Sequence, residues 1–192
     1  MDTNRIALIE DHLRDVASAF QTDPSIYMAL TEAAYNSIQH GYPQEHDFRF
    51  PPLGRQWWAT GSWSPVKSEV KLLVYDQGVG IPETLPTWKN WEKITEWVSA
   101  KHELASLFMK EHANLIEAAL EVSRTSLTSG RGQGLKDVLS PVDVLGTGKV
   151  RILSGKGQVG YSPGGAITKR ENSLHLGGTL IEWTIPVPPG HE

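Results

Sequence analysis

The sequence contains no cysteine, which excludes disulfide bridges, thiolate metal sites and cysteine nucleophiles. No stretch approaches the roughly 18 uninterrupted apolar residues that a membrane-spanning helix needs. The N-terminus also lacks the apolar run of a secretion signal, because charges are spread along MDTNRIALIEDHLRDVASAF. We therefore expect a cytoplasmic protein that does not associate with a membrane.

An excess of positive charge is also missing. The formal net charge is −4, so overall electrostatics do not indicate a nucleic-acid partner. The 192 residues, 39% of them hydrophobic, suffice for one domain with a substantial core. We expect a single domain over residues 1–192. Tryptophan, in contrast, is frequent, with seven residues, and Trp88, Trp91 and Trp97 lie close together.

The hydrophobic pattern predicts helices, then strands. Apolar residues recur at helical spacing over 6–20 and 25–40, and again over 86–126. The segment EVKLLVYD (69–76) has the composition of a strand, and 44–65 contains one or two weaker ones. A short helix begins near Leu135, followed by the strands KVRILSG, QVGYSPGG and TLIEWTIPV. We predict an α+β fold, a two-layer sandwich with helices on one face of a mixed, mostly antiparallel sheet.

The first candidate site residues lie in the second predicted helix. Glu32, Asn36 and His40 are spaced by four, so they share one helical face. A carboxylate and a carboxamide one turn apart can act on the same ion or water. A polar stripe facing solvent is the alternative.

The second motif is Asp76-Gln-Gly78-Val-Gly80, at the end of the apolar strand. An ionised Asp only accepts hydrogen bonds, so Asp76 can receive one from an exocyclic amino group such as that of adenine. The glycines allow backbone to approach a ligand closely. An ordinary turn is the alternative, because Asp and Gly are common turn residues.

The third motif is Gly130-Arg-Gly132-Gln-Gly134-Leu135, directly before a helix. Unpaired N–H groups at a helix N-terminus favour an anion, and phosphate is the obvious candidate. A hinge without ligand contact is the alternative. The fourth motif, Gly177-Gly178-Thr179, precedes a strand, and the Thr179 hydroxyl is a candidate support for the Asp76 carboxylate.

These four motifs, in this order, resemble the N, G1, G2 and G3 boxes of the GHKL ATPases, the group of gyrase B, histidine kinases and MutL. The resemblance covers roughly residues 25 to 185 and implies the Bergerat ATP-binding fold. ALTEAAYNSIQHGY and DQGVGIPETL are most similar to the anti-sigma-factor serine kinases and to stand-alone bacterial histidine-kinase-like ATPases. One departure is that about fifty residues separate the two glycine boxes, whereas those kinases have a shorter lid.

The resemblance implies a role for each residue. Glu32 would be the general base, and Asn36 would coordinate Mg²⁺ between the phosphates. Asp76 would bind the adenine amino group, with Thr179 behind it. The glycines would let backbone pass close to ATP, at Gly78 and Gly80 beside the base and at Gly130, Gly132 and Gly134, next to Leu135, around the phosphates.

The helical insert, about 82–129, is either a helix packed on the domain or a lid that closes on nucleotide or docks a partner. Two functions follow. The first is an ATPase or serine/threonine protein kinase in bacterial regulation, binding ATP or ADP with Mg²⁺ and acting on a regulatory protein. The second is a nucleotide-gated protein-binding switch with little turnover. A homodimer is compatible with both.

Other nucleotide-binding motifs do not fit. Gly148-Lys149 is followed by Val150 rather than by the Ser or Thr of a P-loop. The segment 155–160 matches GxGxxG, yet it connects two predicted strands, and a dinucleotide-binding fingerprint must open a helix.

Overall fold

The computed structural model describes residues 4–16, 23–125 and 134–187. These residues form seven α-helices: α1 (Asn4–Val16), α2 (Pro24–His40), α3 (Ile81–Thr84), α4 (Trp91–Lys101), α5 (Ala105–Phe108), α6 (His112–Thr125) and α7 (Leu135–Leu145). The six strands are β1 (Trp57–Ser64), β2 (Glu69–Asp76), β3 (Lys149–Ser154), β4 (Gly157–Ser162), β5 (Ala166–Glu171) and β6 (Thr179–Pro186). Two short 3₁₀ turns are η1 (Leu85–Thr87) and η2 (Pro163–Gly165).

The strands form one open sheet in the order β1-β2-β6-β3-β4-β5, and every neighbouring pair of described strands is antiparallel. β6 lies between β2 and β3 and runs opposite to both. β2 and β3 therefore point the same way without pairing, and the helices between them form the return connection. The prediction of a mixed, mostly antiparallel sheet is confirmed only in its antiparallel part, because β6 separates the two strands that would otherwise pair in parallel.

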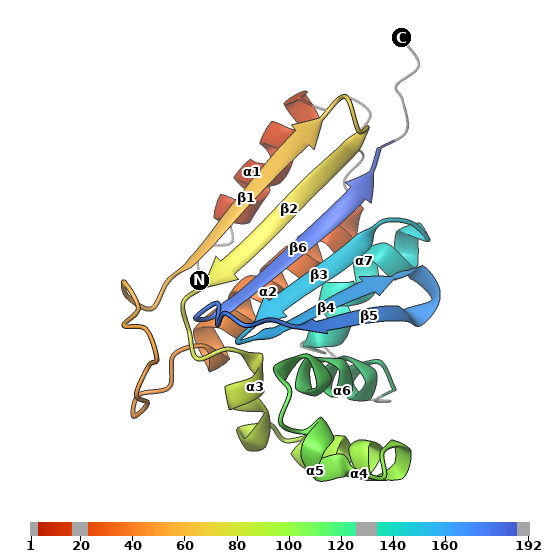
Figure 1. The fold of residues 1–192 in the computed structure, drawn as a ribbon. Coiled ribbons are helices and arrows are strands. Elements are labelled where there is room, and N and C mark those ends of the chain that lie inside the picture. The colour runs from red at the N-terminus through yellow and green to blue at the C-terminus, as the bar shows by residue number, and fades with distance from the viewer. Residues whose placement is uncertain (1–3, 17–22, 126–133, 188–192) are drawn as a thin grey trace.

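The sheet has one apolar face. Along β2, Val70, Leu72 and Val74 are buried, and the residues between them are half-buried, as the two-residue period of a strand requires. Helices α1, α2 and α7 lie together behind this face (Figure 1). The opposite face carries polar pairs such as Arg151–Glu182, with Nη2 and Oε2 2.9 Å apart. This α+β arrangement is compatible with the predicted two-layer sandwich.

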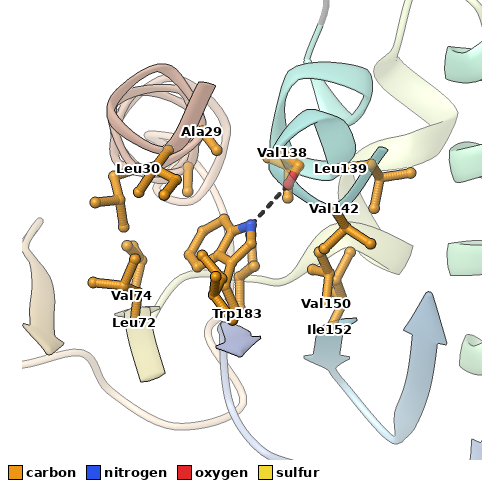
Figure 2. Packing of buried hydrophobic residues seen from close by; sticks show 14 of the residues in the cluster. Ala29, Leu30, Leu72, Val74, Val138, Leu139, Val142, Val150, Ile152 and Trp183 are labelled. Carbon is orange, nitrogen blue, oxygen red and sulfur yellow. Dashed lines mark hydrogen bonds between the residues drawn. The ribbon is translucent and has the colours of Figure 1, made fainter. Parts of the chain in front are cut away.

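Trp183 of β6 joins the sheet to α7. Its side chain is 1% exposed and packs between residues of α2 and α7, as Figure 2 shows. The indole Nε1–H donates to the carbonyl oxygen of Val138 at 2.8 Å, which satisfies its one polar atom. Truncating such a core side chain to Ala costs about 3–5 kcal/mol. Through this contact the core fixes the position of α7, whose first residue borders the candidate site.

The second helix forms where the sequence predicts it. Asp23 caps its first turn, with Oδ1 accepting a hydrogen bond from the N–H of Ser25 at 2.8 Å, and Pro24 occupies the first turn. Gly41 follows the last residue, and its N–H donates to the carbonyl oxygen of Ser37. One face of α2 is buried in the core, through Ile26, Ala29, Leu30, Ala33 and Ala34.

The insert has a small hydrophobic core of its own, which we call the second core: Leu85, Ile94, Val98, Phe108, Ala118, Ala119 and Val122. Helix α6 contributes to both cores, because its Ile116 and Leu120 belong to the main one. It also packs against β4 and β5. The described part of the insert is thus held to the sheet by α6, while α4 and α5 lie farther out (Figure 1).

Two differences from the sequence prediction remain. Strand β5 was not predicted, because its residues AITKRE show no apolar alternation and form an edge strand paired only to β4. The first helix, predicted over 6–20, is described from Asn4 to Val16, and its predicted end lies outside the described residues. No helix in the described ranges is long and apolar enough to cross a membrane.

Candidate functional site

Asp76 ends β2 as a buried carboxylate, 5% exposed. Its Oδ1 accepts a hydrogen bond from the N–H of Gly78 at 2.8 Å, and its Oδ2 lies 3.0 Å from the hydroxyl of Ser37. The N–H of Thr179, its cross-strand partner on β6, also donates to it. A carboxylate offers about four acceptor positions, so roughly one is left for a further donor.

Burial disfavours the charged form of this group. Desolvation raises the pKa of Asp76 above its ordinary value, and the hydrogen bonds from Gly78, Ser37 and Thr179 oppose that rise. An incoming hydrogen-bond donor would stabilise the carboxylate further. The site is therefore suited to a ligand that presents an N–H group.

The turn after Asp76 is packed against the end of α2. A Cβ on Gly78 would lie 2.3 Å from the carbonyl oxygen of Gly41, and the N–H of Val79 donates to that same oxygen at 2.8 Å. Gly78 thus contacts protein backbone and does not border the cavity described below. Gly80 does border it, and its φ of +89° is a conformation that side chains other than glycine rarely adopt.

Ser154, at the end of β3, joins three segments of the site and was not among the predicted residues. Its hydroxyl oxygen accepts a hydrogen bond from the N–H of Ile81 at 2.8 Å and lies 2.9 Å from the hydroxyl oxygen of Thr179. It also donates to the carbonyl oxygen of Gly178 at 3.2 Å. The side chain is completely buried. The predicted support from Thr179 thus differs in detail, since its N–H contacts Asp76 while its hydroxyl contacts Ser154.

The sequence contains one indication that Ser154 has a structural role in the site. In KVRILS the alternation of β3 places Val150, Ile152 and Ser154 on the core face. A serine on the core side of a strand end must find polar partners, because an unsatisfied buried hydroxyl is costly. Those partners lie on segments distant in sequence, so only the fold identifies them.

Glu32 and Asn36 meet the third motif on the other side of the site. The carboxylate of Glu32 accepts hydrogen bonds from the Asn36 side chain and from the N–H of Gly134, about one hundred residues away in sequence. Burial raises the pKa of Glu32, and the negative charge of Asp137 raises it further, while the two hydrogen bonds oppose the shift. A raised pKa makes this carboxylate a better proton acceptor than an ordinary exposed one.

The third motif is described only at its end. Gly134 precedes α7 with φ +64°, and Leu135 is the first residue of that helix. Gly130 and Gly132 lie outside the described residues. The contact between Gly134 and Glu32 therefore represents this motif in the described part of the chain.

These groups surround one cavity of about 410 Å³, a volume within the range of small-molecule sites. Ten site residues were predicted, and seven of the eight that the structure describes line it: Glu32, Asn36, Asp76, Gly80, Gly134, Leu135 and Thr179. His40 also lies on its wall, and burial lowers the pKa of that imidazole. Seven lining residues come from the insert and were not predicted as site residues: Thr84, Leu85, Thr87, Trp88, Lys89, Asn90 and Ser123.

The oxygen ligands at the Glu32 side fit a hard cation shared with a ligand. Mg²⁺ prefers oxygen atoms, keeps several waters and takes one or two groups from protein together with substrate phosphates. The carboxamide of Asn36 borders the cavity beside Glu32 and can supply such an oxygen. Within the described ranges, no group of three or more His, Asp or Glu residues is arranged to hold a metal ion.

No protein-family model matches the chain, and no curated protein matches it either.

Proposed function

We propose that this chain is an ATP-binding module of the GHKL type, which binds ATP with Mg²⁺ in the cavity between α2, α7 and the ends of β2 and β6. One observation carries the proposal. Motifs separated by up to about 150 residues converge on a single cavity, with a buried acceptor at Asp76 and a carboxylate–carboxamide pair at Glu32 and Asn36. That convergence is what the resemblance to the Bergerat fold predicts.

The base end of the site would be the Asp76 side. The remaining acceptor position of Asp76 fits the amino group of adenine, and the apolar side chains of Val74, Ile81 and Ile181 line the same cavity. A planar base needs both a fixed polar contact and apolar walls. The carbonyl of guanine, placed where the amino group of adenine sits, would meet another acceptor, so Asp76 favours adenine.

The phosphate end would be the side of Glu32, Asn36 and Gly134. Asn36 would hold Mg²⁺, which supplies charge neutralisation to the phosphates when bound. Glu32 would take a proton from water or from a protein hydroxyl while that oxygen attacks the γ-phosphorus. The bond from the γ-phosphorus to the bridging oxygen then breaks, and ADP leaves. We place this reaction in the cytoplasmic regulation of another protein.

A nucleotide-gated switch is the second candidate function. It is favoured by the cavity wall, to which the insert contributes Trp88 and Asn90. A ligand that touches these residues changes the environment of the insert and can therefore bias its binding to a partner protein. In that case Glu32 would be dispensable for partner binding.

Calorimetric titration with ADP and ATP in the presence of Mg²⁺ tests the binding site. Wild type is expected to bind both nucleotides. Asp76→Asn should bind them about 10- to 150-fold more weakly, because the ligand loses one hydrogen bond to a charged group. The matched control is Asp47→Asn, in an exposed loop, which should bind like wild type. Equal affinity of wild type and Asp76→Asn would contradict the proposed site.

Asp76→Asn is also expected to fold. An Asn side chain can donate to the oxygen of the Ser37 hydroxyl, whose proton can then go to the carbonyl oxygen of Ala33, and it can still accept from Gly78. Because burial raises the pKa of Asp76, the carboxylate destabilises the fold above that pKa and has no such effect at low pH. The midpoint of unfolding should therefore rise in the variant at pH 8 and match wild type near pH 3.

A time course with γ-labelled ATP separates the two functions. Hydrolysis releases free phosphate, whereas a kinase transfers the label to protein. Glu32→Gln should lower turnover by about 10²- to 10⁴-fold while ATP affinity stays within a few-fold, as expected for a general base. Binding by wild type without turnover, alone or with cell extract, would favour the switch.

A further inference from the structure

Trp88 lies where the cavity meets the second core. Its half-buried side chain packs against that core and also lines the cavity. Its backbone is held on both sides, because its N–H donates to the carbonyl oxygen of Leu85 at 3.0 Å and its carbonyl oxygen accepts from Trp91 at 2.9 Å. The backbone that carries this indole is thus held in place by its own segment.

A chain of hydrogen bonds connects Trp88 to the Asp76 side of the cavity. Thr179 contacts both Asp76 and Ser154. The N–H of Ile81 donates to the Ser154 hydroxyl, and the carbonyl oxygen of Ile81 accepts from Leu85. Leu85 in turn accepts from Trp88. The segment that carries Trp88 is therefore attached to the same framework that holds the buried acceptor.

The neighbouring tryptophans differ in the one property that matters here. Trp91 and Trp97 pack against the second core as Trp88 does, but they do not line the cavity. Trp97 faces other partners, with the Lys101 ammonium 4.5 Å from its ring centroid and the Phe108 ring 6.1 Å away. Of these three residues only Trp88 lines the cavity.

We propose that Trp88 is a ligand-contacting residue supplied by the insert, and that its indole supports the planar base of a purine nucleotide. The inference rests on the proposed function and goes beyond the four motifs, none of which contains Trp88. Aromatic side chains bind bases by stacking, and removing one stacking partner weakens binding about 5- to 150-fold. The insert would then belong to the recognition site itself.

The test is calorimetric titration of Mg²⁺–ADP into the full chain, comparing Trp88→Ala, Trp88→Phe and Trp97→Ala. Trp88→Ala should weaken binding about 5- to 150-fold, while Trp88→Phe, which keeps an aromatic ring, should stay within about 5-fold of wild type. Trp97→Ala is the matched control, because it removes an indole from the same second core. Its affinity for ADP should stay within about twofold of wild type.

Tryptophan fluorescence gives a second readout that does not depend on the stability of Trp88→Ala. ADP should quench the emission of wild type and of Trp97→Phe, and should leave that of Trp88→Phe unchanged at saturating ADP. Equal loss of affinity in Trp88→Ala and Trp97→Ala, or persistent quenching in Trp88→Phe, would overturn the assignment. If wild type binds ADP and Asp76→Asn does not, such a result leaves the proposed function intact. Absence of ADP binding in wild type overturns both.

Discussion

The two ends of the cavity are built in different ways. The Asp76 end consists of strand ends whose polar groups are buried and bonded to one another: Asp76 to Thr179, Thr179 to Ser154, and Ser154 to Ile81. The Glu32 end consists of side chains projecting from α2 toward the start of α7, and Glu32 is only half-buried. The first end is rigid because sheet pairing positions it, whereas the second depends on how two helices approach each other.

The rigid Asp76 end is suited to ligand specificity, and the Glu32 end is suited to proton transfer. A buried acceptor in a rigid frame discriminates between ligands, because an unmatched partner leaves it unpaired. A half-buried carboxylate near another carboxylate has a raised pKa and can exchange protons. The proposed division into a base end and a phosphate end follows this physical difference.

The largest expected change is a loss of folding stability in Gly178→Ala, at the Asp76 end, compared with Gly134→Ala at the Glu32 end. A Cβ on Gly178 would lie 2.0 Å from the carbonyl oxygen of Asp76, and the φ of Gly178 is +115°. A Cβ on Gly134 would meet no atom of the described residues within 4 Å, apart from its chain neighbours. Gly178→Ala should destabilise the protein by at least about 3 kcal/mol, and Gly134→Ala by about 1–2 kcal/mol from backbone strain alone. Denaturant unfolding measures both, and similar losses would show that the two ends are equally rigid.

An intermediate effect is expected at Ser154. Ser154→Ala removes the acceptor for the N–H of Ile81 and the partner of the Thr179 hydroxyl, so buried polar groups lose hydrogen bonds. The expected destabilisation is about 1–3 kcal/mol, with weaker ADP binding. Ser140→Ala is the control, because the Ser140 hydroxyl donates to the carbonyl oxygen of Asp137, one turn earlier on the same helix, and has no other hydrogen-bond partner among the described residues. If Ser154→Ala loses no more free energy of unfolding than Ser140→Ala, the hydrogen bonds of Ser154 do not hold the site together.

The smallest expected effect concerns Asp137 at the Glu32 end. Its charge contributes to the raised pKa of Glu32, so Asp137→Asn should lower that pKa. A general base works when ionised, hence turnover falls as pH drops through its pKa, and the acid limb should move to lower pH in the variant. The rate at pH 8 should change by less than about twofold. A pH–rate profile measures this shift. If the acid limb does not move, Glu32 is not the group whose titration controls the rate.

Local sequence signals predicted the helices and strands whose ends carry capping residues, proline or glycine. α2 begins after a capping Asp23 and Pro24 and is followed by Gly41, and these residues act within one turn of where they stand. β2 was predicted because its apolar residues alternate and its end carries Asp76 and glycine. β5 was not predicted, because its charged residues Lys169, Arg170 and Glu171 give no apolar alternation. Such charges are typical of an edge strand, and β5 forms through its pairing with β4.

In the site too, some features follow from the local sequence and others from the tertiary structure. The sequence determined which groups were available: the carboxylates of Glu32 and Asp76, the carboxamide of Asn36, and glycines that permit a close approach of backbone. Only the tertiary structure decided that Gly134 donates to Glu32, that Ser154 connects the ends of β3 and β6 to the insert, and that Trp88 rather than Trp97 borders the cavity. The reason is physical: a residue type and its local conformation depend on neighbours along the chain, whereas hydrogen-bond partners and burial depend on segments that folding brings together.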